Sequence, residues 1–232
     1  TYVWDVQHDW VTGLDVDAQG NLYAALSANH QAYLRKYSPE GAVIWTRTLD
    51  DFDGFSMSIR ELAVTPAGEI AVTTGISHNG QASSDAQLRR YDTDGNHQWT
   101  RTYVADYMTA VTWDSQGNII TCGFGNLGVD PGDRDVLIRK FASDGLQTWE
   151  RQSNQYEIWP YCNALEVDSN DNIIYVGRAR ADDNDEDVFV GKLDPWGGQT
   201  WFESFHDDVR NSLNVLDVDD AGNIYIAISS GP

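Results

Sequence analysis

Alternation of apolar and polar residues runs through the whole chain and predicts short β-strands. Five segments align without gaps: GLDVDAQGNLYAAL, ELAVTPAGEIAVTT, AVTWDSQGNIITCG, ALEVDSNDNIIYVG and VLDVDDAGNIYIAI. In each segment two alternating runs flank a tight turn, which is the pattern of a β-hairpin. The aligned turn positions, 48, 49, 54 and 51 residues apart, are Gly20, Gly68, Gly117, Asp171 and Gly222. These positions favour glycine because such turns require a positive φ, which Asp also tolerates.

A second hairpin pattern follows each of the first four segments: YLRKYSPEGAVIWTRT, QLRRYDTDGNHQWTRT, LIRKFASDGLQTWERQ and FVGKLDPWGGQTWFES. Four antiparallel strands in about 40 to 50 residues correspond to one blade of a β-propeller. We therefore predict an all-β fold, a five-bladed β-propeller with four-stranded antiparallel blades, forming a single domain over residues 1–232. Counting strands outward from the axis, the blades are expected at about residues 11–50, 57–104, 107–153, 161–206 and 211–232.

The opening residues TYVWDVQHDW match the fourth strand of the repeat, whereas the fifth segment is followed by no second hairpin. Residues 1–10 are therefore expected to form a closing strand, in which Tyr2–Val6 joins the C-terminal blade and closes the ring. One strand is still missing from that blade. It could have three strands, belong to a chain cut from a longer protein, or accept a strand from a neighbouring molecule.

Side chains that recur once per repeat are expected to be structural. Lys36, Arg90, Lys140 and Lys192 recur in the third strand, where a structural ion pair or an extended apolar stem is the favoured interpretation. A large flat side chain can fill the space between adjacent blades. The fourth-strand tryptophans at this position are Trp4, Trp45, Trp99, Trp149 and Trp201.

The two cysteines, Cys122 and Cys162, occupy repeat positions that hold small or apolar residues in the other copies. Our first interpretation is that both are buried free thiols. They are expected at the same end of neighbouring blades, so a disulfide is the alternative.

These motifs resemble the bacterial SBBP-type β-propeller repeats, whose units contain D-x-x-G-N-x-Y, then D-x-F-x-x-K-Y-D-x-x-G, then W-T-R. The first motif fits at Asp17, Asp114 and Asp219, but Thr65 and Glu69 depart from it in the second copy. The aspartate before the third strand fits in three copies, at Asp85, Asp135 and Asp187, and Gln31 replaces it in the first. The resemblance covers nearly the whole chain. It implies a secreted or surface-exposed propeller, used for binding or as a spacer, with no shared catalytic residues.

The composition restricts the classes of molecule that the protein is expected to bind. Fifteen Lys and Arg residues against 36 Asp and Glu give a formal net charge of -21, which disfavours nucleic acids and anionic membranes. No apolar run is long enough for a membrane span, so direct membrane insertion is not expected. We expect the protein outside the cell or at the cell surface, with a protein or glycan ligand or copies of itself as partners.

The loops between the second and third strands, and between blades, vary in sequence and are the expected binding face. Aromatic residues there could form a platform for a sugar ring or an apolar protein patch, or could simply cap the core: Trp10, Phe55, Tyr107, Trp159 and Tyr161. An acidic run could bind Ca²⁺ through its oxygen atoms, or could be a solvated loop: Asp182, Asp183, Asp185 and Asp187.

The function predicted from the sequence is that of a non-catalytic, secreted or cell-surface binding or scaffold module. One alternative is a structural subunit of an extracellular homopolymer, in which a neighbour completes the last blade. Another is a propeller-type hydrolase or lyase, for which Asp182, Asp183 and His206 are the candidate residues.

Overall fold

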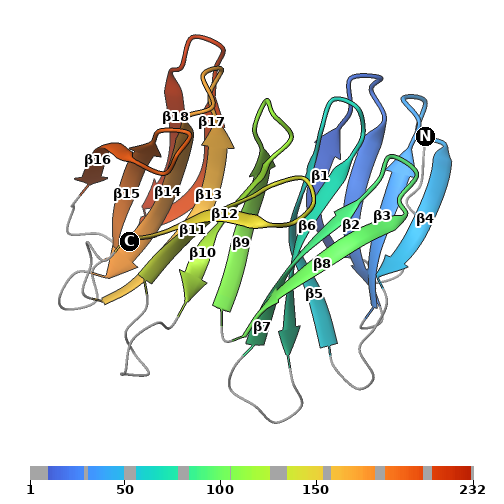
Figure 1. Ribbon diagram of the computed structural model, residues 1–232, viewed down its shortest axis with the longest axis horizontal. Coiled ribbons are helices and arrows are strands. Elements are labelled where there is room, and N and C mark those ends of the chain that lie inside the picture. Colours follow the sequence, from blue (N-terminus) through green and yellow to red (C-terminus); the bar gives the residue numbers. More distant parts are fainter. Residues whose placement is uncertain are drawn as a thin grey trace. The chain divides into compact units, whose positions relative to one another are not determined.

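A computed structural model describes residues 10–28, 31–49, 56–77, 84–104, 106–125, 135–153, 158–180, 186–205 and 211–230. These residues form 18 β-strands, so the all-β prediction is confirmed (Figure 1). No helix in the described part of the chain is long and apolar enough to cross a membrane. The chain divides into two compact units between Met108 and Thr109, which are described separately below, and the single domain over residues 1–232 stays a prediction.

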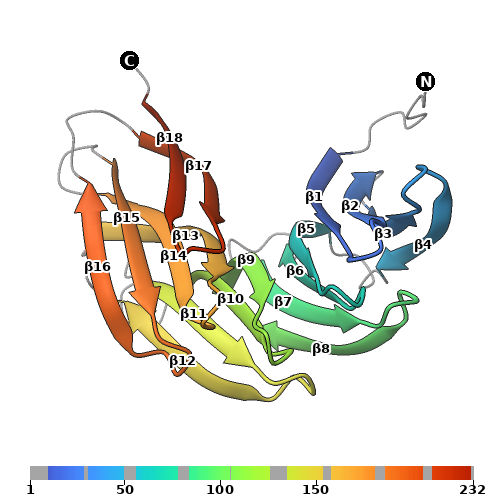
Figure 2. The same ribbon diagram turned by 90° about the horizontal axis from the view of Figure 1, so that it is seen from above.

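The first unit contains two four-stranded antiparallel sheets, in which each strand pairs with the next along the chain (Figure 2). The first sheet consists of β1 (Trp10–Val16), β2 (Leu22–Ala28), β3 (Gln31–Tyr37) and β4 (Val43–Leu49). The second consists of β5 (Ser56–Val64), β6 (Ile70–Ser77), β7 (Ser84–Tyr91) and β8 (His97–Tyr103).

The second unit repeats this arrangement twice and then adds a smaller sheet. Its first sheet contains β9 (Asp106–Trp113), which begins just before the boundary, β10 (Ile119–Gly125), β11 (Asp135–Phe141) and β12 (Gln147–Ser153). The next contains β13 (Ile158–Val167), β14 (Ile173–Arg180), β15 (Glu186–Leu193) and β16 (Gln199–Phe205). The last has two strands, β17 (Asn211–Val218) and β18 (Ile224–Ser230), joined by a short turn at the top of Figure 1.

Four of the five predicted blades are thus present as four-stranded sheets, and the fifth contributes two described strands. The closing strand Tyr2–Val6, with Trp4, lies outside the described residues. Five blades and a closed ring therefore remain predictions.

The turns explain why the hairpins form where the sequence predicts them. The turn position that aligns with glycine in the other copies has φ 60° at Asp171, the only residue other than glycine with a positive φ in the described chain. Gly117, its counterpart in the preceding sheet, has φ 75°. An Asp tolerates this left-handed conformation better than most residues because its short side chain forms local hydrogen bonds.

The core lies between sheets, and the second and third strands contribute most of it. All seven residues of β10 are buried, as are six of the seven in β11. In the outer strand β12, every residue except Ser153 is instead exposed or half-buried. Outer strands are therefore the amphipathic ones, whereas the inner strands read as continuous apolar runs because both of their faces are covered.

A bulge in the first strand of four of the sheets was not predicted from the sequence. The pairing register skips one residue between Val11 and Gly13 in β1, and the equivalent irregularity recurs in β5, β13 and β17. The skipped residues are polar: Thr12, Arg60, Asn163 and Asn214. Thr12 Oγ1 donates to the carbonyl oxygen of Ala25 at 3.4 Å, so a polar side chain at this position can bond to the neighbouring strand.

The cysteine prediction was wrong in its first form. Cys122 of β10 and Cys162 of β13 form a disulfide with a Cα–Cα distance of 5.9 Å, and neither is a free thiol. The repeat alignment identified two small buried positions, but it could not show that they face each other across two sheets. The bond covalently connects the two four-stranded sheets of the second unit.

Candidate functional site at the two ends of the sheets

Each sheet has a turn end, formed by the short connections inside its hairpins, and a loop end, formed by the variable connections. At the turn end of the β9–β10 hairpin, Asp114 Oδ1 accepts hydrogen bonds from the backbone amides of Gln116 at 2.9 Å and Asn118 at 2.8 Å. Its Oδ2 accepts from Asn118 Nδ2 at 2.8 Å. This is an Asx turn, in which the aspartate side chain accepts hydrogen bonds from backbone amides of the same turn. Asp17, Asp168 and Asp219 bond to their own turns in the same way.

The same aspartates pair with the repeated third-strand cations. Asp114 Oδ2 lies 2.8 Å from Lys140 Nζ, and Asp168 Oδ2 lies 2.8 Å from Lys192 Nζ. In the first sheet the corresponding distance, between Asp17 and Lys36, is 3.4 Å. These contacts explain the repeated charges as structural ion pairs between the first turn and the third strand.

The second copy keeps this ion pair although its sequence departs from the motif. Thr65 replaces the turn aspartate and cannot carry a charge, but its Oγ1 still accepts from the amide of Glu69 at 3.0 Å. Glu69 replaces the motif asparagine, and its Oε1 lies 2.6 Å from Arg90 Nη2. The two departures therefore compensate each other, with the acid moved four residues along the turn.

The turn aspartates stay ionised well into the acid range. Burial alone would raise the pKa of Asp168, but hydrogen bonds from Lys192 and Asn172 lower it to about 2. In the first sheet, burial opposes hydrogen bonds from Asn21 and Tyr23 and the charge of Lys36, and the net effect lowers the pKa of Asp17 to about 2. Aspartates held by such donors act as fixed anions at neutral pH, without the raised pKa of a general acid.

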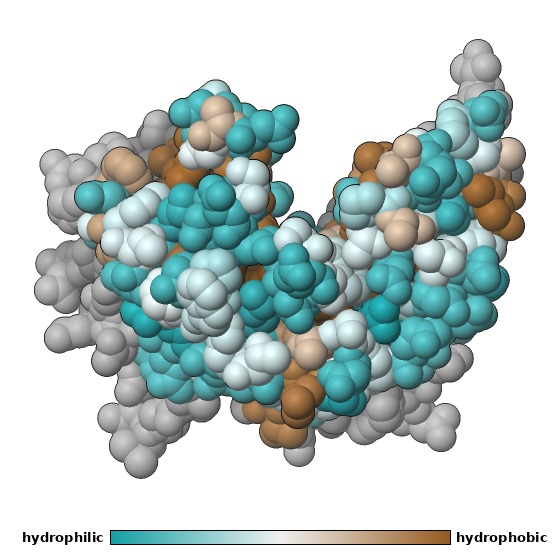
Figure 3. All heavy atoms as spheres, turned by 45° about the horizontal axis from the view of Figure 1, so that its top comes forward, coloured by the Kyte–Doolittle hydropathy of each residue, from teal (hydrophilic) through white to brown (hydrophobic). Residues whose placement is uncertain are grey.

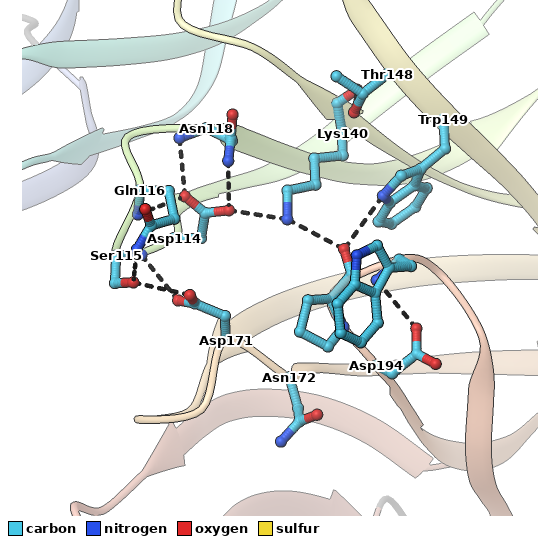
Figure 4. Close-up of polar contacts among 12 residues, drawn as sticks. Asp114, Ser115, Gln116, Asn118, Lys140, Thr148, Trp149, Asp171, Asn172 and Asp194 are labelled. Atoms are coloured by element: carbon cyan, nitrogen blue, oxygen red, sulfur yellow. Dashed lines mark hydrogen bonds and ion pairs between the residues drawn. The ribbon is translucent and has the colours of Figure 1, made fainter.

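Turn ends also connect neighbouring sheets within the second unit (Figure 4). Lys140 Nζ and Trp149 Nε1 both donate to the carbonyl oxygen of Pro195, at 3.1 Å and 3.3 Å. The Ser115 hydroxyl donates to Asp171 Oδ2 at 2.7 Å, and its amide donates to Oδ1 at 2.8 Å. Because these polar groups bond to the neighbouring sheet, we interpret the turn end of these two sheets as structural.

The fourth-strand tryptophans lie against the next sheet in both units. A Cβ on Gly95 would be 3.0 Å from the Trp45 ring, and one on Gly197 would be 3.2 Å from the Trp149 ring. Glycine lets the turn approach the indole closely. Trp201 is 36 % exposed, and Trp99 lies beneath the guanidinium of Arg101 at 5.3 Å.

The loop end of the second unit carries a different cluster, which consists of Phe124, Tyr161 and Arg178. The Phe124 and Tyr161 rings meet edge to face, with centroids 4.6 Å apart. The Arg178 guanidinium carbon lies 5.6 Å from the centre of the Tyr161 ring, and the two residues are directly opposite each other in β13 and β14. Phe124 is buried and Tyr161 is half-buried, so the cluster offers part of a phenol ring and a cation at one place.

One covalent bond and one close strand approach hold this cluster in position. The Cys122–Cys162 disulfide lies two residues from Phe124 and one residue from Tyr161 along their strands. Gly177 precedes Arg178, and a Cβ on it would lie 2.1 Å from the carbonyl oxygen of Tyr161 and 2.3 Å from Phe189. The strands thus approach too closely for any side chain at residue 177.

The structure describes only part of the predicted aromatic platform. Trp10 begins β1 and Trp159 lies in β13, but their side chains are outside the described residues, as is Phe55 altogether. Tyr107 is half-buried in β9. Of the predicted set, Tyr161 contacts Phe124 and Arg178, which were missed because they occupy ordinary positions of the second strand.

The predicted calcium ligands are mostly outside the described residues. Asp182, Asp183 and Asp185 are not described, nor is His206. Asp187 lies in β15 opposite Ala179 and is buried. Among the residues that the structure describes, no group of three or more His, Cys, Asp or Glu side chains could hold a metal ion. Calcium binding therefore stays a prediction.

The face of the molecule drawn in Figure 3 is mainly polar. With the turns brought forward, Figure 3 shows mainly hydrophilic side chains and small apolar patches. Trp196, in the turn between β15 and β16, is the most exposed large apolar residue of the described chain, at 81 %.

No family model matches this chain. One curated protein, the regulatory protein FlaEY of Caulobacter vibrioides, is 31 % identical over 135 residues, which cover 48 % of this chain and 14 % of that protein. The chain therefore matches only a small part of that relative, and the match does not define a family.

Solved β-propellers are similar in fold. The Dos1 propeller has a TM-score of 0.58 at 14 % identity, over 95 % of this chain and 52 % of that one. A Lactobacillus plantarum protein has a TM-score of 0.60 at 12 % identity, over 95 % and 64 % of the two chains. An ulvan lyase of polysaccharide lyase family 25 gives 0.60 at 11 % identity, over 88 % and 57 %. The sheets are therefore of the β-propeller type, and the chain spans about half to two thirds of these propellers.

The similar structures include enzymes as well as other proteins. Besides the ulvan lyase, they include a puromycin hydrolase and a putative gluconolactonase, with TM-scores of 0.59 and 0.51. At identities of 10 % to 14 % these likenesses establish the fold alone.

Proposed function

We propose that this protein is a non-catalytic β-propeller module that binds a protein or glycan partner through the loop ends of its sheets. The observation that carries the proposal is the cluster of Phe124, Tyr161 and Arg178. It is the described place where an aromatic ring and a cation meet outside the repeated positions. Because the repeats explain the turn-end contacts as scaffold, features that occur once are the better candidates for function.

The chemistry of the cluster fits a ligand with both an apolar face and polar groups. A half-buried tyrosine can stack on a sugar ring or an apolar protein patch, and Arg178 can donate hydrogen bonds beside it. The net charge of -21 opposes polyanionic ligands. Neutral glycans and proteins with a basic or apolar surface are therefore the expected partners.

The disulfide supports a location outside the cell or at its surface. Structural disulfides persist in oxidising compartments and are rare in the cytosol. The Cys122–Cys162 bond agrees with the secreted character that the SBBP-type resemblance implies. A five-bladed single domain closed by Tyr2–Val6, and calcium at the acidic loops, are further parts of this proposal.

A hydrolase or lyase is the second candidate, because the similar propellers include a lyase and a hydrolase. Its active site would draw on loop residues such as Asp182, Asp183 and His206. Loss of a detected activity on substitution of these three residues would favour the enzyme over the binding module.

The experiment is a glycan-array and protein pull-down screen with the wild-type chain, followed by affinity measurement with two variants. Tyr161→Ala should weaken binding of any ligand found by at least tenfold, since the stacking ring is lost. Trp196→Ala is the matched control, because it removes an exposed aromatic residue at the turn end of the same sheet. Equal loss in both variants, loss in Trp196→Ala alone, or a blank screen at high protein concentration would contradict the proposal.

A further inference from the structure

Three residues of the second sheet depart from the repeat at one place in the first unit. Arg60 occupies the bulge of β5, where the other copies have threonine or asparagine. Thr73 of β6 occupies a position that holds alanine, cysteine or valine in the other copies. Gly75, also in β6, aligns with serine, phenylalanine or arginine. Features that occur once on a repeated scaffold are candidates for function, and these three occur together.

The three departures lie on one face of the sheet. Thr73 and Gly75 are two residues apart in β6, so they share a face. A Cβ on Gly75 would be 3.3 Å from both Arg60 Nε and Nη2, and 3.5 Å from Ser58 Oγ. The Arg60 guanidinium therefore lies over Gly75, on the same face as Thr73, with the Ser58 hydroxyl beside it. The lack of a side chain at residue 75 makes room for the guanidinium.

Arg60 is a cation without a protein partner. Of the Lys and Arg side chains that the structure describes, Arg60 alone has no ion pair, hydrogen bond or contact with an aromatic ring. The adjacent Glu61 does not pair with it. Arg60 is also exposed. Its planar guanidinium presents N–H donors in a fork that matches the two oxygen atoms of a carboxylate.

Thr73 supplies an independent sign of a missing acceptor. Its side chain is 0 % exposed, and its Oγ1 has no hydrogen-bond partner in the described part of the chain. Val176, at the equivalent position of β14, is equally buried, so an apolar side chain of the same shape fits there. Buried hydroxyls normally have a partner. Because Arg60 is exposed, a change of its rotamer can admit an acceptor that receives hydrogen bonds from both residues.

From these contacts we infer that Arg60, Ser58 and Thr73 form a binding site for one carboxylate group of a small organic molecule. The guanidinium donates to both carboxylate oxygens, and the two hydroxyls donate to them from β5 and β6. Gly75 positions the guanidinium. The net charge of -21 opposes polyanions but opposes a molecule with a single negative charge much less. The site belongs to the first unit and does not depend on the proposed function, which rests on the second.

The probe is sodium acetate, added to the wild-type chain at constant ionic strength in sodium chloride. NMR follows the Gly75 amide and the Arg60 Nε–H group. Acetamide, which has nearly the same shape without the charge, is the control ligand. We expect a saturable shift with acetate and none with acetamide. No saturable shift with acetate would overturn the inference, including the case in which an acid of the chain itself occupies the guanidinium. An equal response to inorganic phosphate would overturn the assignment to a carboxylate.

Variants then test the residues. Arg60→Gln should weaken acetate binding by about tenfold, and Arg60→Lys by less, because an ammonium group keeps the charge but not the fork. Thr73→Val should weaken it by about threefold through loss of the hydroxyl. Arg35→Gln is the matched control, since it removes the same charge from β3, where Arg35 donates to Thr46 Oγ1. Unchanged binding in Arg60→Gln and Arg60→Lys, or an equal loss in Arg35→Gln, would overturn the inference.

Discussion

The turn ends of the sheets share repeated contacts, whereas the described loop end of the second unit has contacts that occur once. At the turn ends each four-stranded sheet uses the same contacts, an acid in the first turn and a cation in the third strand, and one copy preserves them through a paired exchange. At the loop end of the second unit the contacts of Phe124, Tyr161 and Arg178 and the disulfide occur once. Repetition therefore marks what every blade needs, and departure from it marks where this chain differs from a generic propeller.

The largest expected effect on stability comes from adding a side chain at Gly177, where the strands near the loop end are closely packed. Gly177→Ala places a Cβ against the Tyr161 carbonyl oxygen and the Phe189 ring, and backbone cannot move aside easily. We expect a loss of about 3 kcal/mol or more in the free energy of unfolding, measured by denaturant titration. Gly117→Ala, at a turn end with nothing within 4 Å of the new Cβ, should cost only about 1 kcal/mol for its positive φ. Similar losses in both variants would remove the distinction between the two ends.

The disulfide should have the next largest effect. Cys122→Ser with Cys162→Ser removes a cross-link between residues 40 positions apart. Such a loss typically costs about 2 to 4 kcal/mol, largely because the unfolded chain gains freedom. Reduction of the wild-type protein should lower the unfolding midpoint of the second unit to that of the double variant. The double variant itself should not respond to reductant, and any response would point to another target.

The turn-end ion pair should contribute less, and its contribution should depend on pH. The folded pKa of Asp168 is about 2, below the unfolded value of about 3.9, so its stabilisation is complete above pH 4 and is lost as the pH falls toward 2. Asp168→Asn should cost about 2 kcal/mol at pH 7, and the gap between variant and wild type should narrow between pH 4 and pH 2. Asp220→Asn, at an exposed turn residue, is the control. A gap that does not change over this range would show that the charge is unimportant.

The smallest effect is expected in the second copy, where both partners are more accessible. Glu69→Asn breaks the pair with Arg90 and should cost about 0.5 to 1 kcal/mol. Restoring the motif with Thr65→Asp in the same chain should recover that loss, because the aspartate then takes the position that Asp114 has in its own turn. A double-mutant cycle by denaturant titration measures the coupling. Additive effects would mean that the two departures do not compensate each other.

The sequence predicted the strands well because their signals are local. Alternation, turn glycines and the period predicted the four-stranded antiparallel sheets, and the ion pair, one of the two interpretations of the repeated charges, is present in each of the four. Contacts between sheets were harder to predict. Cys122 and Cys162 occupy two positions that are apolar in the other repeats. The sequence of one strand does not show how far that strand lies from a strand of another sheet, so their disulfide was not the first interpretation.

The candidate site was predicted only in part for the same reason. Tyr161 stood out because an aromatic residue at a loop interrupts the repeat. Phe124 and Arg178 sit at the ends of second strands, where an apolar or basic residue is unremarkable until the next sheet is in place. The bulge at Thr12 was missed because one skipped residue does not disturb the alternation on either side of it.

The contacts of Asp171 with Ser115 have a consequence for how the second unit unfolds. Asp171 belongs to the β13–β14 turn and also accepts hydrogen bonds from Ser115 of the preceding sheet. Unfolding of this turn therefore breaks contacts with that sheet as well. Together with the bonds to the Pro195 carbonyl oxygen and the disulfide, this turn couples the two four-stranded sheets at both ends. Slow amide hydrogen exchange in β10 and β14 should therefore share one opening free energy, so that the two sheets behave as a single cooperative element.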